Sequence, residues 1–504
     1  MLPLRIDRPT RLSHSEPPAL RVAEILSALS FALDLTDGQP MGHSVRSCVF
    51  GMHLAREIGL PVARQADLYY ALLMKDAGCS SNASRMFQIL GTDDIRAKRD
   101  VKTTDWTKAG WDSLEYALSH VRTGAPFLER VRALVDMAIH QKRNARDLVQ
   151  IRCERGASIA RRIGFSEEVA QAILSLDELW NGAGQPEGLH GQQIPLCSRI
   201  MNLSQNLDVF YMTQGAQAAI TIAETRSGTW FDPDLVKAFR SISRDPVLWS
   251  EVNDAAVKVM DLEPRESVFA SNEETLDRIC LAFADVIDAK SPFTYRHSTG
   301  VAGAAIAIGT TLGCTSHEVT TLRRAALLHD IGKLGVSNSI LDKPGKLSEE
   351  EWEAVKNHPY YTFEILRRIP GFRDLSDVAA SHHEKLDGSG YFRNRRAEDL
   401  SLPARILVVA DIFDALHAER PYREALPLET VFEIMQKDAP KALDASCFEA
   451  LRMSSDNAAK VSADLMRLSS HVESENADSR ASANQTQKDG KRILPTAPSL
   501  SHLP

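Results

Sequence analysis

Apolar residues recur at intervals of three and four positions along most of this chain, and that spacing is the period of an α-helix. The pattern is clearest after Ser271 and Glu274, which have the spacing of a capping box at a helix N-terminus. The apolar residues that share one face of this predicted helix are Leu276, Ile279, Cys280, Phe283, Val286 and Ile287. The segment Lys290–Pro292 should end the helix, because proline cannot extend the hydrogen-bond ladder.

The same helical period appears in residues 319–330, 349–369 and 427–437, whereas the alternating pattern of strands is nearly absent. The sequence therefore predicts an all-α fold. From residue 469 onward the chain turns to small and polar residues with few large apolar ones. We expect this tail, residues 469–504, to be disordered because it cannot bury enough apolar surface.

With 504 residues the chain is too long for one ordinary core, which favours two or three domains. The net charge of −8 argues against DNA or RNA as a partner, since nucleic-acid binders usually carry a basic excess. Seven scattered cysteines without a CxxC pair indicate reduced thiols. The N-terminal segment lacks the apolar stretch of a signal peptide, and no apolar run approaches the roughly 20 residues of a membrane span. We therefore expect a cytoplasmic protein without a membrane segment.

Two parts of the chain resemble each other at constant offsets, as expected of an internal repeat. The residues around His43 and Asp76 match those around His297 and Asp330, at an offset of 254 positions. Further along, at an offset of 206, the matching segments are 161–163 with 367–369, 177–178 with 383–384, 181–184 with 387–390, and 199–200 with 405–406. The change in offset predicts an insertion in the first copy at about residues 90–145.

The repeat predicts two tandem helical domains of one type. The first copy spans residues 20–230, the second spans 270–465, and connecting helices fill 231–269.

The second copy gathers the side chains that divalent metals favour. Between residues 297 and 411 it contains His297, His329, Asp330, His358, His382, His383 and Asp411. Mixed imidazole and carboxylate ligands without thiolate suit hard or borderline divalent metals, and this set exceeds the needs of one ion. A pair of metals lowers the pKa of a shared water and neutralises a phosphodiester, so the set points to a phosphohydrolase. A lone histidine is more often a hydrogen-bonded core residue, but two adjacent pairs before a glycine-rich turn are hard to explain that way.

The segments Leu328–Lys333 (LHDIGK) and His382–Tyr391 (HHEKLDGSGY) resemble the two motifs of the HD-GYP subgroup of HD-domain phosphohydrolases. The resemblance extends from about Phe293 to Arg423, and its two motifs stand in the right order. It implies a helical fold, a centre of iron or manganese ions, and hydrolysis of cyclic di-GMP to linear pGpG or to GMP.

Carried over position by position, the resemblance makes the seven residues above metal ligands, with Asp330 as the bridge between ions. Lys333 matches the family's phosphate-contacting lysine, a cation that would stabilise charge developing in the transition state. Asp330 and Lys333 are thus the predicted catalytic pair. The predicted substrate-binding residues are Lys333, Gly390, Tyr391, Arg420 and Arg423.

Two positions depart from the family pattern. The third residue of the GYP turn is Phe392 instead of proline, so the substrate loop should differ. Phe293 stands where members with three metals have a glutamate, and because phenylalanine cannot ligate we expect two divalent ions. Gly388 and Gly390 also have a purely structural explanation, namely a turn with unusual backbone dihedrals.

The first copy has lost most of the ligand set. Its matching positions are occupied by His43, Lys75, Asp76, Arg152, Leu176, Asp177 and Gln205. Lys75 and Arg152 put cations where metals would sit, so we expect this copy to be catalytically inactive. Its favoured role is to cover the catalytic domain or to form a homodimer or signalling contact. Binding of a nucleotide or another anion is the less favoured alternative.

The sequence therefore predicts a metal-dependent phosphodiesterase whose leading substrate is cyclic di-GMP. One alternative is 3′3′-cyclic GMP-AMP, because tandem HD architectures resembling this one occur among enzymes for that substrate and Phe392 departs from the motif. Another is a non-catalytic signalling protein that binds a cyclic dinucleotide, but the intact ligand set of the second copy argues against it. No residue pattern distinguishes a guanine edge from an adenine edge.

Overall fold

The computed structural model describes residues 20–104, 111–123, 125–265, 271–418 and 424–489, and at 111–114, 141–142 and 469–489 the backbone alone. Within these ranges the regular structure is helical, and strand pairing is limited to two isolated bridges. The predicted all-α fold is confirmed. None of the described helices is both long and apolar enough to cross a membrane.

The first half of the chain contains the helices α1 Val22–Thr36, α2 His43–Glu57, α3 Val62–Met74, α4 Ala83–Leu90, α5 Asp94–Thr103, α6 Trp111–His120, α7 Phe127–Ile163, α8 Glu167–Leu174, η1 Gly191–Gln193, α9 Leu196–Gln214 and α10 Ala216–Thr225. Connecting helices follow, namely α11 Pro233–Ile242, α12 Pro246–Asn253, α13 Ala255–Lys258 and η2 Val259–Leu262.

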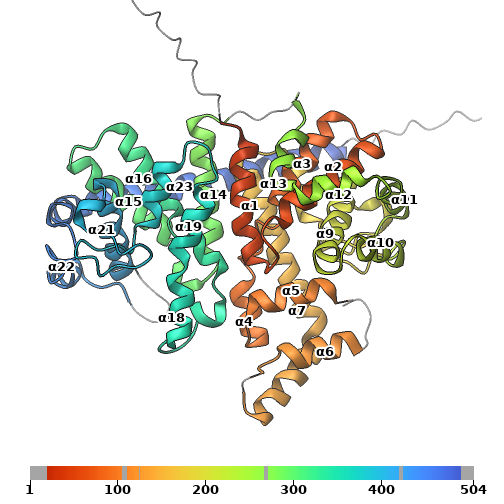
Figure 1. Cartoon of the computed structure of the whole chain (residues 1–504), viewed down its shortest axis with the longest axis horizontal. Helices are drawn as coiled ribbons and strands as arrows, with labels where there is room; N and C mark the ends of the chain where they lie inside the picture. The colour runs from red at the N-terminus through yellow and green to blue at the C-terminus, as the bar shows by residue number, and fades with distance from the viewer. Residues whose placement is uncertain (1–19, 105–110, 124, 266–270, 419–423, 490–504) are drawn as a thin grey trace, which may run out of the picture.

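The second half contains α14 Glu273–Asp288, η4 Pro292–Thr294, α15 His297–Thr311, α16 Ser316–Leu328, η5 Ile331–Gly335, α17 Asn338–Leu341, α18 Glu349–Lys356, α19 His358–Leu366, α20 Arg373–Ala380, η6 Ala397–Asp399, α21 Leu402–His417, α22 Leu428–Gln436 and α23 Ala445–Asp489. Figure 1 shows the two halves side by side, with α1 at the boundary between them.

The internal repeat is visible in the helix boundaries. Helices α3 and α16 begin and end 254 residues apart, and α8 and α20 begin and end 206 residues apart. Contacts recur at the same offsets. Asp34 accepts a hydrogen bond from the Ser44 hydroxyl at 2.8 Å, and the matching Asp288 accepts one from Ser298 at 2.6 Å. The two halves therefore share local structure as well as sequence.

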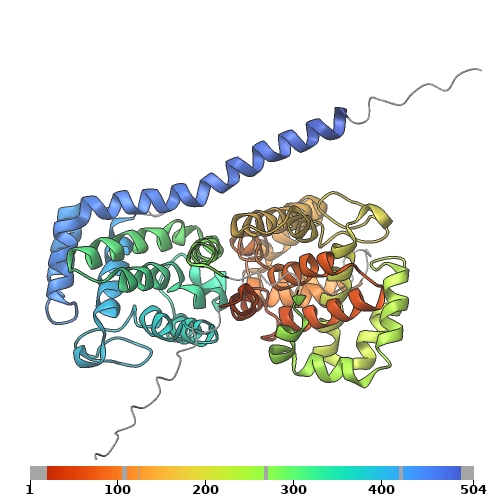
Figure 2. The ribbon, with the colours of Figure 1, turned by 90° about the horizontal axis from the view of Figure 1, so that it is seen from above.

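One hydrophobic core runs through both halves, from Val22 to Leu465. Helix α1 of the first half packs against η5 and α19 of the second. The long helix α23 contacts α15 in its own half and α7 in the other, and Figure 2 shows it extending past the second half toward the first. The second half is thus covered on one side by the first half.

The region predicted as an insertion, about residues 90–145, contains α5, α6 and the N-terminal part of α7. It contributes to a second, small core formed by Met86, Leu90, Ala97, Ala117 and Val121. Figure 1 shows α6 and the start of α7 projecting away from the rest of the molecule.

The predicted helix after residue 271 is present, but its cap differs. Asn272 accepts the hydrogen bond from the backbone N–H of Thr275 at 2.7 Å, whereas Ser271 donates its hydroxyl to the carbonyl oxygen of Leu20. Ser271 therefore ties α14 to the first half and does not cap it. The six residues predicted to share the apolar face are all buried.

Two other predictions need correction. Residues 349–369 were predicted as one helix, but α18 and α19 are separated at Asn357, because Pro359 is tolerated only in the first turn of a helix. The tail was predicted to be disordered from residue 469, but α23 continues to Asp489. Its segment 469–489 contains no proline or glycine to interrupt a helix. Residues 490–504 lie outside the described residues.

Candidate metal centre and substrate cleft

Three of the predicted histidine ligands are oriented by the same local contact. The Nδ1 atoms of His329, His358 and His382 lie 2.6–2.7 Å from the carbonyl oxygen three residues earlier in the chain. Because a carbonyl oxygen only accepts, each Nδ1 carries the hydrogen and donates it. Each ring therefore directs its Nε2 atom into the interior, the arrangement typical of histidines that bind metals.

Asp330 lies at the centre of these rings. Its Oδ1 atom is 3.3 Å from Nε2 of His358 and 3.5 Å from Nε2 of His382. Its Oδ2 atom is 3.4 Å from Nε2 of His329 and 3.7 Å from Nε2 of His297. One carboxylate oxygen thus faces each pair of imidazoles, which is the geometry of a carboxylate that bridges two cations.

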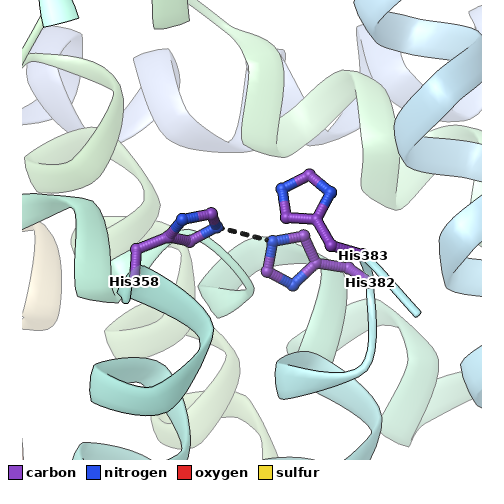
Figure 3. A group of neighbouring side chains, drawn as sticks. All are labelled: His358, His382 and His383. Atoms are coloured by element: carbon purple, nitrogen blue, oxygen red, sulfur yellow. Dashed lines mark hydrogen bonds between the residues drawn. The ribbon is translucent and has the colours of Figure 1, made fainter. Parts of the chain in front are cut away.

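The remaining two predicted ligands complete the two sides. Asp411 lies 3.2 Å from Nε2 of His297, on the side of His297 and His329. His383 forms a group with His358 and His382 on the other side, and Figure 3 shows these three rings together. The structure therefore brings all seven predicted ligands together in one buried cluster, in which His383 is the most exposed member.

The contact between His358 and His382 indicates that this cluster needs a cation. Their Nε2 atoms are 2.9 Å apart, as the dashed line in Figure 3 marks. Since both Nδ1 atoms already carry hydrogens, two lone pairs would face each other in the neutral rings. Nε2 of His329 and Oδ1 of Asp330 are buried and make no hydrogen bond within the described part of the chain. Unsatisfied acceptors of this kind fit divalent metals.

The titration behaviour of the cluster agrees with that fit. Burial lowers the pKa of His358 to about 4, and it also lowers the pKa of His382 and His383, so these rings stay neutral as ligands must. Burial acts against ionisation of Asp330 and Asp411, but the neighbouring histidines outweigh it at both groups and hold both pKa values low. At Asp330 the ammonium of Lys333 adds to this effect. At neutral pH these three imidazoles are therefore neutral and the two carboxylates ionised, whereas Asp330 and Asp411 outweigh burial at His329 and raise its pKa.

His297 differs from His358, His382 and His383 in the direction of its pKa shift. Burial opposes its protonation, but hydrogen bonds to Asp411 and Asp414 prevail and raise its pKa to about 10. Its Nδ1 atom lies 2.6 Å from Asp414. Asp414 is a contributor that the sequence analysis missed, and it holds His297 as a carboxylate in the outer shell of a metal site does. The signal that could have identified it is the recurrence of the same aspartate, Asp208, at the offset of 206.

Lys333 lies next to the bridging carboxylate. It follows Asp330 by one turn, in η5, and its Nζ atom donates to Oδ2 of Asp330 at 2.7 Å. About 21% of its side chain is exposed, so the ammonium can also reach a phosphate that enters the site. The structure thus places Lys333 beside the cluster, and its contact with substrate stays a prediction.

A cleft of about 830 Å³ opens over the histidines. His382, His383, Trp352, Tyr391 and Phe392 are among the residues that line it. The ring of Tyr391 lies 4.6 Å from that of His383 and 6.2 Å from that of Trp352, measured between centroids. Aromatic faces beside a metal cluster provide surfaces on which nucleobases stack.

The glycine-rich turn is held by a buried glutamate that the sequence analysis did not single out. Glu384 accepts hydrogen bonds from the backbone N–H groups of Arg393 and Arg395, both at 2.8 Å. A Cβ atom on Gly390 would lie 2.6 Å from the carbonyl oxygen of His383, so this glycine permits close packing of the turn. The predicted residues Arg420 and Arg423 lie outside the described residues.

Comparison with known proteins identifies the family. The HD domain matches residues 137–235 and 282–447 of this chain. The chain is 43% identical over 433 residues to the 3′3′-cGAMP-specific phosphodiesterase 3 of Vibrio cholerae, covering 86% of this chain and 94% of that one. The chain belongs to the HD-GYP family.

A solved structure supports the same HD-GYP assignment. The crystal structure of a cyclic GMP-AMP-specific phosphodiesterase of V. cholerae, V-cGAP3, matches with a TM-score of 0.61 and 39% identity. The match covers 87% of this chain and 98% of that one. The cyclic di-GMP phosphodiesterase response regulator RpfG of Xanthomonas campestris is 38% identical over 180 residues, or 35% of this chain and 47% of that protein. The predictions of this family and of a phosphodiesterase are confirmed.

The first HD copy keeps the framework of the site but replaces its ligands. His43 lies 2.6 Å from Asp208, as His297 lies from Asp414. In place of the ligand cluster, a buried ion pair joins Lys75 to Asp76, and a partly buried one joins Arg152 to Asp177.

One group of ligand type survives in the first HD copy, namely Asp37, His43 and Asp76. Lys102 is paired with Asp37 and lies 3.5 Å from the His43 ring, so a lysine already occupies the space beside this group. The charge of a metal is thus supplied here by lysine and arginine.

Proposed function

We propose that this protein hydrolyses 3′3′-cyclic GMP-AMP to a linear dinucleotide with the help of two divalent ions of iron or manganese type. The observation that carries the proposal is Asp330, whose two oxygens face two separate groups of ligands. The metal dependence of HD-domain phosphohydrolases supports the cofactor. The similarity to a 3′3′-cGAMP-specific enzyme across both HD copies supports the substrate.

The proposed ligands divide into two groups that share Asp330. One ion would be held by His297, His329 and Asp411, and the other by His358, His382 and His383. When bound, two such ions lower the pKa of a water molecule and neutralise the phosphodiester. The chain itself fixes the direction of each Nε2 atom through the carbonyl contacts and through Asp414.

Other residues would act on the substrate directly. Lys333 would place its ammonium beside the phosphate that approaches Asp330 and stabilise charge that develops on the phosphate oxygens. Tyr391, Trp352 and Phe392 would stack against a base in the cleft. Burial raises the pKa of the Tyr391 hydroxyl, so it stays protonated and can donate a hydrogen bond. Arg420 and Arg423 remain predicted substrate contacts.

The choice of substrate revises the sequence-based prediction. The sequence favoured cyclic di-GMP and kept 3′3′-cyclic GMP-AMP as the alternative. The relative that spans both HD copies is specific for 3′3′-cGAMP, whereas the match to the cyclic di-GMP enzyme RpfG covers 35% of this chain. We therefore favour the alternative, and cyclic di-GMP becomes the competing substrate in the test.

The test is hydrolysis of both cyclic dinucleotides by the full chain, purified without oxygen and loaded with Mn²⁺ or Fe²⁺. Products are separated by chromatography, and kcat/KM is compared for the two substrates. We expect cleavage of both to depend on metal and 3′3′-cyclic GMP-AMP to be cleaved faster. A higher kcat/KM for cyclic di-GMP would overturn the substrate assignment.

Two variants serve as internal controls. The double substitution His329→Ala/Asp330→Ala should abolish cleavage and lower the metal content. His317→Ala, at an exposed histidine outside the cluster, should change neither. Metal analysis should give two ions per chain. No cleavage of either substrate by protein that carries two ions would refute the enzyme and favour a binding protein.

A further inference from the structure

The first copy retains a cavity where the second copy has its metal centre. This cavity has a volume of about 300 Å³. Its lining includes Arg152, Asp177 and Gln205, which match the metal ligands His358, His383 and Asp411 of the second copy. Cavities of roughly 300–1,000 Å³ hold small ligands in other proteins. Loss of the metal ligands has therefore left a space of ligand size.

The cations in this cavity are all engaged by acceptors of the chain itself. Lys102 is paired with Asp37, and Arg152 is paired with Asp177. Lys98 donates to the carbonyl oxygen of Cys79 at 2.7 Å and lies 3.7 Å from the carboxylate of Asp94. Because each of these cations already has an acceptor, a phosphate or nucleotide would have to displace an existing contact, which disfavours an anion at this site.

The rest of the lining is mainly apolar, with two unsatisfied acceptors. The apolar side chains include Met86, Leu90, Leu148, Val149, Leu179 and Trp230. Oδ1 of Asn82 and Oε1 of Gln205 are buried and have no hydrogen-bond partner in the described part of the chain. Only 6% of Asn82 and 7% of Gln205 is exposed. A buried acceptor without a donor costs about 1–3 kcal/mol, so a donor arriving with a ligand would be favoured.

We propose that the first copy binds a neutral, mainly apolar small molecule that donates hydrogen bonds through O–H or N–H groups. The apolar lining selects the body of this ligand, and Asn82 and Gln205 select its donors. The paired lysines and arginine disfavour an anion. The site lies in the copy without the metal cluster and does not depend on the substrate of the second copy.

The probe for this site is 2-naphthol, a neutral fluorescent ring compound with one hydroxyl donor. Its matched control is 2-methoxynaphthalene, which has a similar body without the donor, and 2-naphthalenesulfonate is the anionic comparison. Binding to the full chain is measured by fluorescence titration. We expect one saturable site for 2-naphthol, with roughly tenfold weaker binding of the methoxy compound for the lost hydrogen bond.

Two substitutions locate the binding in this cavity. Leu148→Trp should fill the cavity and remove binding of both neutral probes. Gln205→Leu, which keeps the side-chain size, should weaken the binding of 2-naphthol but leave the binding of 2-methoxynaphthalene unchanged. Thermal unfolding and circular dichroism of each variant confirm that it is folded. Binding that survives Leu148→Trp, tighter binding of the sulfonate, or no saturable binding of either neutral probe would overturn the proposal.

Discussion

Phe392 occupies the position at which the GYP motif has proline, and its backbone explains the difference. Its φ angle is +94°, a value that the ring of proline does not permit. The side chain packs against Tyr360 and Phe363, with ring centroids 6.1 and 6.2 Å apart, and the Arg393 guanidinium lies over its ring. The turn therefore has its own conformation, stabilised by aromatic packing at the edge of the cleft.

A proline at this position should be harmful in spite of the family motif. We expect Phe392→Pro to destabilise the protein by about 3 kcal/mol or more, because the turn must rearrange. The control Phe392→Gly loses the ring contacts but suits a positive φ angle. Thermal unfolding and kcat/KM of the two variants are compared. A proline variant as stable and active as the glycine variant would contradict this account of the turn.

The residues of the candidate metal cluster could be named from the sequence because their order and spacing form a motif. The direction of each ring was not predictable, since it depends on carbonyl oxygens such as Ala326 and Val355 that sequence letters do not display. Asp414 was missed although the repeat pairs it with Asp208, because its contact with His297 forms only when α21 is packed against α15. Glu384 was named only as part of the repeat, and its hydrogen bonds to the turn required coordinates.

At the level of elements, the approach of η5 to α19 requires a glycine. A Cβ atom on Gly332 would lie 2.0 Å from the carbonyl oxygen of His358. The same approach occurs in the first copy, where a Cβ on Gly78 would lie 1.9 Å from the carbonyl oxygen of Arg152. This contact sets where α19 begins and thereby where His358 lies.

Gly332→Ala should therefore move α19 and disrupt the cluster. We expect a lower metal content and a lower melting temperature. We also expect activity to fall at least tenfold, which is roughly the effect of misplacing a catalytic geometry by about 1 Å. Gly335→Ala in the same segment is the matched control, because its nearest contact would be an ordinary 3.4 Å to Leu35. Metal analysis and thermal unfolding distinguish the two. Equal effects of both substitutions would show that the close approach is not the cause.

Asp34, near the end of α1, has a carboxyl group at the N-terminus of α2 whose titration should affect stability. Asp34 accepts hydrogen bonds from the backbone N–H groups of Gly42 and Ser44 and from the Ser44 hydroxyl. Burial raises its pKa to about 7, against the opposing influence of Lys75 and Ser44. The folded state holds the proton of Asp34 more tightly than the unfolded state does. The contribution of this group to stability is therefore fully present at pH values below the pKa of an aspartate in the unfolded chain. It is lost as the pH rises through about 7.

Asp34→Asn should remove this dependence. Relative to the variant, the wild type should lose about 3 kcal/mol of unfolding free energy between about pH 5 and about pH 8, because one pKa unit corresponds to about 1.4 kcal/mol. Urea unfolding of both proteins at the two pH values measures the change. Parallel pH profiles would contradict the raised pKa.

At the scale of the whole molecule, Asp94 joins the two copies. It is fully buried at the start of α5 and lies 2.9 Å from the ammonium of Lys290 in the second copy. It also accepts hydrogen bonds from the backbone N–H of Asn338 at 2.7 Å and from the Ser337 hydroxyl at 3.1 Å. Lys98 of the same helix lines the cavity of the first copy. Helix α5 thus connects that cavity to the catalytic copy.

Removal of this carboxylate should destabilise the whole chain. Asp94→Ala would leave Lys290 buried without its charge partner, at a cost of about 3–5 kcal/mol. Asp136→Ala is the control, because its pair with His140 is exposed and contributes little. Denaturant unfolding compares the two with the wild type. A loss below 1 kcal/mol for Asp94→Ala, on the order of a surface pair, would show that Lys290 finds another partner.

The duplication was predictable because both copies keep residues such as His43 and His297 at fixed spacing. The way in which the copies meet was not, since Asp94 and Lys290 lie far apart in the sequence and neither belongs to a motif. The extent of α23 was also misjudged, because a polar composition without proline is compatible with a helix as well as with disorder.

The shared core has a consequence for how this gene can vary. Helix α1 packs against η5, which directly follows Asp330, and against α19, which begins at His358. The first copy therefore supports the candidate site as a scaffold, whatever chemistry it has of its own. Mutations that inactivate the enzyme should therefore arise in α1 as well as in the HD-GYP motifs. A truncation that keeps only residues 270–465 would expose to solvent the apolar surface that is buried against the first half in the full chain. Expression of that fragment is expected to give aggregated protein in place of a minimal enzyme.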